Sequence, residues 1–256
     1  MKRIKVFSLL IILILGSFWI YLNCNYVTPI FMYHSIDKTR VDTYAAVSSI
    51  VFRKQMEFIK NNKYKVISLS DYCSLLKDGK KIPRNLVVIT FDDGYEDNSK
   101  AIDILEEFGY PMTVFLIAEE IGKDSFLKRE NIVSFLDDDT RRVDIGSHTL
   151  THAYLPDYDR MRIKKEIFES KKVLEDMFSK NVELISYPIG GFSKEILNDV
   201  EEAGYLCACA TNRGFSRQLD RFALRRIKIT NRDLDFRLWA KLSGFYNAFR
   251  KPKNPN

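Results

Sequence analysis

The chain has 256 residues, of which 46% are hydrophobic and 13% aromatic, so it can bury a substantial core and is not expected to be disordered. Its formal net charge is +6 and its pI is near 9.0, but Lys and Arg are spread along the chain without an arginine-rich block or an aromatic-plus-basic motif. Nucleic-acid binding is therefore not expected, whereas anionic envelope polymers and lipid head groups are compatible partners.

The N-terminus combines basic residues with the apolar stretch from Val6 to Leu22, which approaches the thickness of a bilayer as a helix. Positive charge precedes this stretch and none follows it closely, which favours a cytoplasmic N-terminus. We expect a signal anchor with a transmembrane helix at 1–25, an extracytoplasmic globular domain at 26–249 and a disordered tail at 250–256. Cleavage as a signal peptide, which would release the domain, is the alternative, although no small-x-small site follows the apolar stretch.

Short apolar runs bounded by turn residues alternate with amphipathic segments along the rest of the chain. The runs predicted as strands are Pro29–Tyr33, Leu86–Phe91, Met112–Ile117, Val143–Gly146, Glu183–Tyr187, Tyr205–Ala210 and Arg226–Ile229. Helical patterns lie at Phe52–Ile59, at Ala101–Phe108 before Gly109, and at Asp159–Phe178. This alternation predicts a parallel α/β sheet or barrel, in which ligand chemistry gathers at the carboxyl ends of the strands.

The four cysteines, Cys24, Cys73, Cys207 and Cys209, lie at spacings that indicate neither a zinc ribbon nor a disulfide framework. Cys207 and Cys209 belong to one strand-like run and should face the same side as small hydrophobic residues. We expect all four to be structural. Lipidation of Cys24 is not expected, because the residue before a lipidated cysteine should be small and Asn23 stands there.

All three histidines of the chain follow predicted strands or lie in the loop after one, together with two adjacent carboxylates. His34 follows the first predicted strand, Asp92 and Asp93 follow the second, and His148 and His152 lie after the fourth. Parallel strands present their carboxyl ends on one face of a barrel, so these residues should converge there.

His148 and His152 are spaced i, i+4, which places them on one face if the segment is helical and suits two nitrogen ligands for one metal ion. A zincin protease would need Glu directly after the first His, where Thr149 stands. Asp92 or Asp93 can complete a facial three-ligand set with open positions for water and substrate, and the other can take a proton from water.

At these residues the sequence resembles the NodB-homology polysaccharide deacetylases, carbohydrate esterase family four. Thr90–Tyr95 (TFDDGY) matches the first motif of the family, Gly146–His152 (GSHTLTH) matches the second, and Tyr187–Gly190 (YPIG) resembles the third. The similarity extends from about Pro29 to Ile229. It implies a distorted (β/α) barrel with fewer than eight regular units, preceded in this chain by the predicted transmembrane helix.

The resemblance also implies roles for individual residues. Asp92 would be the catalytic base, and Asp93, His148 and His152 would hold a divalent cation, commonly zinc in this family, with cobalt or nickel as alternatives. The oxyanion formed at the acetamide carbonyl would be stabilised by the cation and by a backbone N–H, which we place at Ile189.

Two departures from the family pattern concern the acid and the orientation of the base. Many members donate a proton to the leaving amine from a histidine near the C-terminus, but no histidine follows His152. His34 resembles the acid of the branch that deacetylates poly-N-acetylglucosamine, and it is predicted as the general acid, with ordering of the barrel mouth as the alternative. The third motif often carries an Arg that contacts the catalytic Asp; Ser186 stands there, so Arg226 is predicted to orient Asp92, with a surface salt bridge as the alternative.

The predicted function is hydrolysis of N-acetyl groups on N-acetylhexosamine residues of an extracytoplasmic polysaccharide. Peptidoglycan, a poly-N-acetylglucosamine-type exopolysaccharide and a chitin-like oligomer are the candidate substrates, and the arrangement of His34 favours the second. The alternatives are an O-acetyl esterase or another amidohydrolase on the same scaffold, and a non-catalytic glycan-binding relative. The presence of all four residues of the metal and base set argues against the last, because sequence drift usually removes a ligand first.

Overall fold

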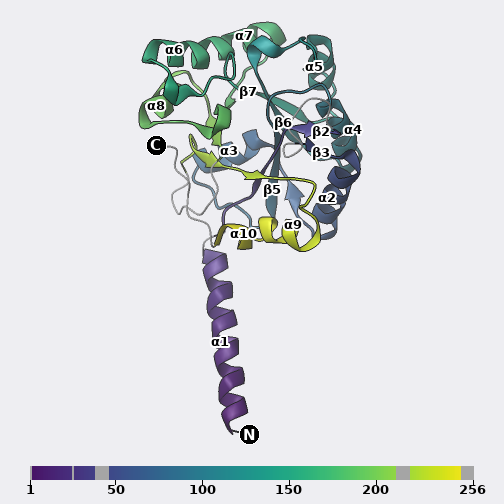
Figure 1. Cartoon of the computed structure of the whole chain (residues 1–256), viewed down its shortest axis with the longest axis vertical. Helices are drawn as coiled ribbons and strands as arrows, with labels where there is room; N and C mark the ends of the chain where they lie inside the picture. The colour runs from purple at the N-terminus through teal and green to yellow at the C-terminus, as the bar shows by residue number, and fades with distance from the viewer. Residues whose placement is uncertain (1, 25, 38–45, 212–219, 249–256) are drawn as a thin grey trace.

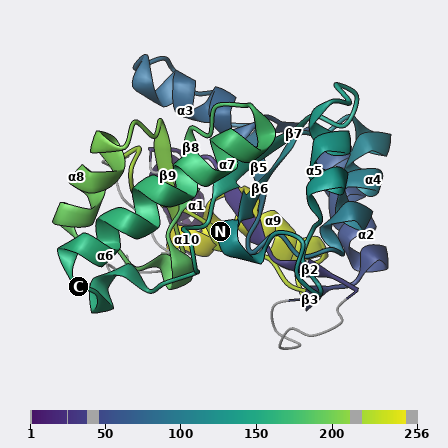
Figure 2. The ribbon, with the colours of Figure 1, turned by 90° about the horizontal axis from the view of Figure 1, so that it is seen from above.

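A computed structural model describes residues 2–24, 26–37, 46–211 and 220–248. Within these residues nine strands form one sheet, which curves into a nearly closed barrel with helices around it (Figures 1 and 2). The strands are β1 (Ile30–Tyr33), β4 (Lys65–Val66), β5 (Leu86–Phe91), β6 (Met112–Leu116), β7 (Val143–Ser147), β8 (Leu184–Ser186), β9 (Cys207–Ala210), β10 (Leu224–Arg225) and β11 (Ile227–Lys228). A separate pair joins β2 (Ser35–Ile36) to β3 (Ala46–Val47).

The strand order is β10-β9-β8-β7-β6-β5-β1-β11, with β4 also pairing with β5. Every pairing in this sheet is parallel. The two edges of the sheet come from neighbouring parts of the chain, because β10 pairs with β9 and β11 pairs with β1, and only Arg226 separates them. Arg226 therefore stands where the barrel closes.

The helices around the sheet are α2 (Ser49–Asn61), α3 (Leu69–Lys77), α4 (Asn98–Phe108), α5 (Arg129–Leu136), α6 (Arg160–Lys164), α7 (Ser170–Phe178), α8 (Lys194–Glu202), α9 (Asp235–Leu242) and α10 (Phe245–Ala248). A π-helical turn, η3 (Lys165–Glu169), joins α6 to α7, and short 3-10 turns lie at η1 (Ala118–Glu120), η2 (Leu155–Asp157) and η4 (Pro188–Gly190). The predicted helix Asp159–Phe178 is thus one continuous segment with a π turn inside it.

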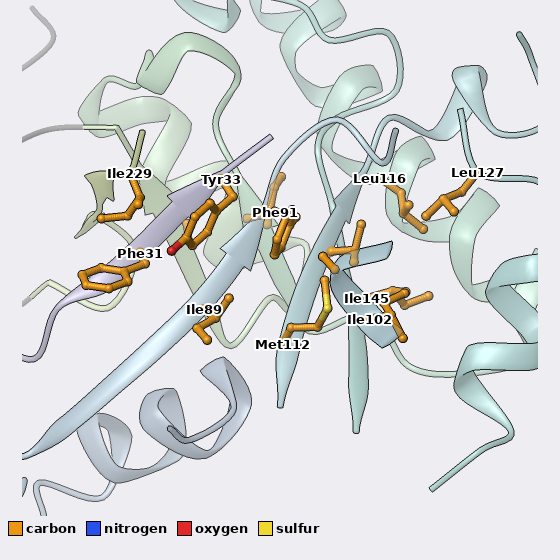
Figure 3. Packing of buried hydrophobic residues seen from close by; sticks show 14 of the residues in the cluster. Phe31, Tyr33, Ile89, Phe91, Ile102, Met112, Leu116, Leu127, Ile145 and Ile229 are labelled. Atoms are coloured by element: carbon orange, nitrogen blue, oxygen red, sulfur yellow. The ribbon is translucent and has the colours of Figure 1, made fainter. Parts of the chain in front are cut away.

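Alternation along the strands divides the core into two clusters. Val87, Ile89 and Phe91 of β5 pack with the surrounding helices in the larger cluster, part of which Figure 3 shows. Leu86 and Val88, on the opposite face, belong to a second cluster that also includes residues of α3. Burial of both faces is what a parallel sheet requires, and it explains why these strands read as continuous apolar runs.

The seven predicted strands are present, with ends that differ by at most two residues from the predicted ones. The predicted parallel (β/α) barrel is thereby confirmed. The short strands β2, β3, β4 and β10 are not among the predicted ones, because two-residue strands produce no periodicity that a sequence pattern could reveal. The predicted tail at 250–256 lies outside the described residues.

Helix α1 (Lys2–Cys24) extends away from the barrel, with its C-terminal end near α9 and α10 and its N-terminal end pointing away (Figure 1). Phe18 of α1 makes an edge-to-face contact with Phe245 of α10, with ring centroids 6.0 Å apart. In the described part of the chain, no helix combines the length and the apolar character needed to cross a bilayer. The transmembrane part of the sequence prediction is therefore not supported.

The cysteine spacings indicated no disulfide framework, but the structure contains one disulfide. Cys73 of α3 and Cys207 of β9 form a disulfide with their Cα atoms 6.1 Å apart, although 134 positions separate them in sequence. Cys209 is a buried free thiol in the same cluster. The pairing depends on how α3 packs against the sheet, which spacing does not reveal. The side chain of Cys24 lies outside those that the structure describes.

Loss of this disulfide is expected to lower the free energy of unfolding by about 2–5 kcal/mol, because the cross-link restricts a long loop in the unfolded chain. Urea denaturation followed by circular dichroism, with and without a phosphine reductant, measures the effect. Cys73→Ala should unfold at a lower urea concentration than the wild type and should be insensitive to reductant. Cys209→Ala is the control and should remain sensitive. An unchanged wild-type midpoint after complete reduction, verified by thiol titration, would contradict the prediction.

Candidate functional site

Arg226 forms a buried ion pair with Asp92 at the closure of the barrel. Its Nη1 donates to Asp92 Oδ1 at 2.6 Å and its Nη2 to Asp92 Oδ2 at 2.7 Å. The guanidinium also donates to the hydroxyls of Thr90 and Ser186, and Nε donates to the carbonyl of Ala210. Arg226 has no solvent exposure, so the alternative of a surface salt bridge is excluded. This two-pronged contact fixes the plane of the Asp92 carboxylate.

The ion pair decides the charge of Asp92. Burial by itself would raise the pKa of this carboxyl, but Arg226, assisted by His148, lowers it below its ordinary value. Because the pKa is lower in the folded than in the unfolded state, the pair contributes stability above the unfolded-state pKa and loses that contribution as the pH falls through the folded-state pKa. At neutral pH Asp92 is a carboxylate, the form that can accept a proton.

Asp93, His148 and His152 converge as the sequence predicted. Asp93 Oδ1 lies 3.4 Å from His148 Nε2 and 3.4 Å from His152 Nε2, and one ligand atom from each residue lies within 4.8 Å of the others. Asp93 Oδ1 is buried and has no hydrogen-bond partner in the described residues. An unpartnered carboxylate oxygen that faces two imidazole nitrogens fits a divalent cation.

The hydrogen bond on the other side of His148 supports the same assignment. His148 Nδ1 lies 2.8 Å from the carbonyl oxygen of Ser186, which can only accept, so Nδ1 carries the proton. In the neutral ring the lone pair is then on Nε2, directed at Asp93, as in a metal ligand held by a backbone carbonyl. Burial lowers the pKa of His148, but Asp92 and Asp93 outweigh burial and raise it.

The backbone at these ligands is strained. Asp93 has φ 72°, and Gly94 follows with φ 74°, where an added Cβ would lie 2.7 Å from Leu116 Cδ2. His148 and His152 are not on one helical face, as their spacing suggested, but on a loop in which Thr149 and His152 have φ of 64° and 62°. Non-glycine residues in this region are uncommon and concentrate at functional sites.

His34 follows β1 and shares the electrostatic environment of the site. Burial lowers its pKa, whereas the charges of Asp92 and Asp93 oppose that shift. Its backbone carbonyl accepts a hydrogen bond from Asn98 Nδ2 at 2.6 Å, and its Nδ1 is buried without a protein partner in the described residues. The backbone is thus fixed while the ring nitrogen stays available. The role of His34 as an acid remains a prediction.

Ile189 lies on the turn after β8, with φ 58° and a relative exposure of 68% for the residue. Its carbonyl accepts from Thr211 Oγ1 at 3.0 Å, and Gly190 packs so closely on Thr211 that an added Cβ would lie 2.0 Å from that hydroxyl. Thr211 therefore holds this turn in one conformation. The predicted use of the Ile189 N–H as an oxyanion donor stays a prediction.

Tyr95 is a site residue that the sequence reasoning missed. Burial together with the charge of Asp93 raises the pKa of the Tyr95 phenol. Its ring stacks on Phe126 with centroids 5.3 Å apart. The position of Tyr95 directly after the Asp-Asp-Gly segment was the available signal. A sequence position on a turn does not show which way the side chain points, so this signal was not sufficient.

The sequence profile of the family described as polysaccharide deacetylase matches residues 79–208. The chain is 31% identical over 216 residues to the YxkH protein of Bacillus subtilis (strain 168), whose name places it among the polysaccharide deacetylases; the match covers 84% of this chain and 75% of that protein. It is 27% identical over 186 residues to the poly-beta-1,6-N-acetyl-D-glucosamine N-deacetylase of Staphylococcus aureus (strain MSSA476), covering 68% of this chain and 63% of that enzyme.

Among solved structures, the Streptococcus pyogenes deacetylase PplD in complex with acetate superposes with a TM-score of 0.77. The superposition covers 85% of this chain and 99% of that one, at 22% sequence identity. At that identity the similarity shows a shared fold.

Arg226→Met is expected to lower the free energy of unfolding by about 3–5 kcal/mol, because it leaves the buried Asp92 carboxylate unpaired. Adding Asp92→Asn removes the second charge and should recover most of the loss. Arg53→Met is the control, since Arg53 forms an equally two-pronged but exposed pair with Glu107, and it should change stability little. Chemical denaturation of the four proteins measures the effect. Equal losses for Arg226→Met and for the double variant would show that the unpaired charge is not the cause.

Proposed function

The chain belongs to the polysaccharide deacetylase family, and on that basis we propose that it is a metal-dependent hydrolase that removes N-acetyl groups from N-acetylhexosamine residues of a polysaccharide. The observation that carries the proposal is the convergence of Asp93, His148 and His152 beside a separate carboxylate, Asp92, that Arg226 keeps ionised and oriented. One carboxylate is thereby available to a cation and the other to a proton.

Asp93, His148 and His152 would hold the cation, which we propose to be zinc. A divalent cation in this position supplies Lewis-acid polarisation of the acetamide carbonyl and lowers the pKa of water. Asp92 takes the proton of the attacking water, and its contact with Arg226 keeps the accepting oxygens in place during the transfer.

Two further residues at the barrel mouth act on the oxyanion and on the leaving amine. The backbone N–H of Ile189 donates to the developing oxyanion, an interaction that strengthens as the charge forms. His34 donates a proton to the amine nitrogen as the C–N bond breaks, which gives acetate and a free amine. Burial lowers the pKa of His34 although the charges of Asp92 and Asp93 oppose that shift, so the protonated ring gives up its proton readily.

The substrate we propose is a poly-N-acetylglucosamine-type exopolysaccharide. The relative from Staphylococcus aureus is named for activity on poly-beta-1,6-N-acetyl-D-glucosamine, and the position of His34 at the end of β1 agrees with that branch of the family. Peptidoglycan and chitin-like oligomers are the competing substrates of the same chemical class. All three present an N-acetyl group on a hexosamine.

We also propose that the domain works outside the cytoplasm. The Cys73–Cys207 disulfide supports this location, because disulfides persist in oxidising compartments and are rare in the cytosol. The candidate substrates are exported glycans, so the location and the substrate class agree.

The central test is acetate release from the three polymers by purified protein. Activity should disappear after chelation and return when zinc, cobalt or nickel is added. Asp92→Asn should keep its metal and lose about 10²–10⁴-fold in kcat, as expected for removal of a general base. His152→Ala should lose both metal and activity. If none of the polymers yields acetate after the metal is restored, the proposed function is wrong.

His34→Ala is expected to slow amide hydrolysis by about 10²–10⁴-fold and to affect hydrolysis of 4-nitrophenyl acetate far less, because nitrophenolate leaves without a proton. Rates on both substrates at equal metal content measure the difference. A histidine that only ordered the barrel mouth would slow both reactions alike, and that result would remove His34 from proton transfer.

A further inference from the structure

The two candidate metal-binding histidines lie on a loop that is not self-supporting. We define the histidine loop as residues 147–153. Thr149 and His152 both have positive φ, and Thr149 is β-branched, for which this conformation is a genuine outlier. Such residues keep strained conformations only where the surrounding structure enforces them. Residues outside the loop must therefore stabilise its conformation.

Glu166 provides the side-chain part of that support, beside backbone N–H groups of Ala118 and Glu119 that donate to the carbonyls of Thr149 and Leu150. Its side chain is fully buried, and its Oε2 accepts hydrogen bonds from the backbone N–H groups of Leu150 and Thr151, both at 2.9 Å. Its Oε1 accepts from the Thr151 hydroxyl at 2.7 Å. The two N–H groups belong to residues between His148 and His152, so one carboxylate fixes the segment that separates the two ligands.

Glu166 is the centre of a polar ridge made of Arg162, Glu166 and Ser170, spaced four residues apart along the continuous helix. Arg162 Nη2 lies 2.6 Å from Glu166 Oε1 and donates to Thr151 Oγ1 at 3.1 Å. Ser170 Oγ lies 2.8 Å from the hydroxyl of Ser147, at the start of the histidine loop. The ridge passes through the π turn η3, a feature that recurs at functional sites.

We propose that Glu166 is a positioning residue of the metal centre, whose carboxylate holds the histidine loop so that Nε2 of His148 and of His152 face Asp93. The inference rests on the metal centre of the proposed function and adds to it the group that organises its ligands. Because Glu166 is fully buried, it acts through the histidine loop. A carboxylate that served stability alone would not change how tightly the ligands bind a cation.

Glu166→Gln tests the inference, because glutamine keeps the size of the side chain but cannot accept from Thr151 and Arg162 through its amide nitrogen. Titration of metal-free protein with Co²⁺, followed by visible absorption, should give a Kd about 10–100-fold above that of the wild type, as for other groups that orient metal ligands. The Co²⁺ spectrum should also change, since it reports the geometry of the ligands.

Asp199→Asn is the matched control. Asp199 is also a buried carboxylate paired with an arginine, since it accepts from Arg160 Nη2 at 2.9 Å, but it lies on α8. This variant should lose stability and keep the wild-type Kd and spectrum. A Glu166→Gln protein that binds Co²⁺ within about twofold of the wild type, with an unchanged spectrum, would falsify the inference.

Two further outcomes are distinguishable. If Glu166→Gln does not fold, Thr151→Val decides the question, because it removes only the hydroxyl that bonds Glu166 and Arg162. A Kd raised at least about threefold supports the inference, and an unchanged Kd overturns it. If the wild-type protein itself does not bind Co²⁺, the metal centre of the proposed function is wrong and the inference about Glu166 fails with it. The wild-type titration therefore distinguishes this failure from a failure of the inference alone.

Discussion

The buried pair of Arg226 and Asp92 is the interaction on which the arrangement of the site depends. A single charge in the barrel interior would be costly, so each partner is tolerated only because the other is present. Arg226 lies between β10 and β11, which pair with opposite edges of the sheet, and Asp92 follows β5. The pair therefore joins the point where the barrel closes to the carboxylate that we propose as the base. The contact that forms where the barrel closes therefore also orients Asp92.

The position in the sequence of the arginine that contacts Asp92 distinguishes this chain from the family pattern. The last residue of β8, where the family often has an Arg, is Ser186, whose hydroxyl accepts from Arg226 and whose carbonyl accepts from His148. A small residue there leaves room for a guanidinium that arrives from another strand. The same charge beside the same carboxylate is thus supplied from a different point in the sequence, and Ser186 connects the ion pair to the candidate metal ligand His148.

The loops at the barrel mouth contain strained backbone residues, and neighbouring side chains stabilise each loop. Asp93, Thr149, His152 and Ile189 all have positive φ, and each lies on a loop that follows a strand end. Packing against Leu116, the carboxylate of Glu166 and the hydroxyl of Thr211 hold these loops from behind. The strands supply a rigid frame, and the loops store the strain that places the ligands.

The sequence by itself determined the parallel barrel, the main strands and the residues Asp92, Asp93, His148 and His152, because apolar runs and motif residues are local signals. It could not determine the disulfide, the π turn or the support from Glu166, since each joins positions far apart along the chain or depends on exact packing. It suggested a helical face for the two histidines, where the tertiary structure uses a strained loop. Arg226 shows the division well: the sequence proposed it as the partner of Asp92 but left a surface salt bridge open, and the closure of the barrel decided between the two.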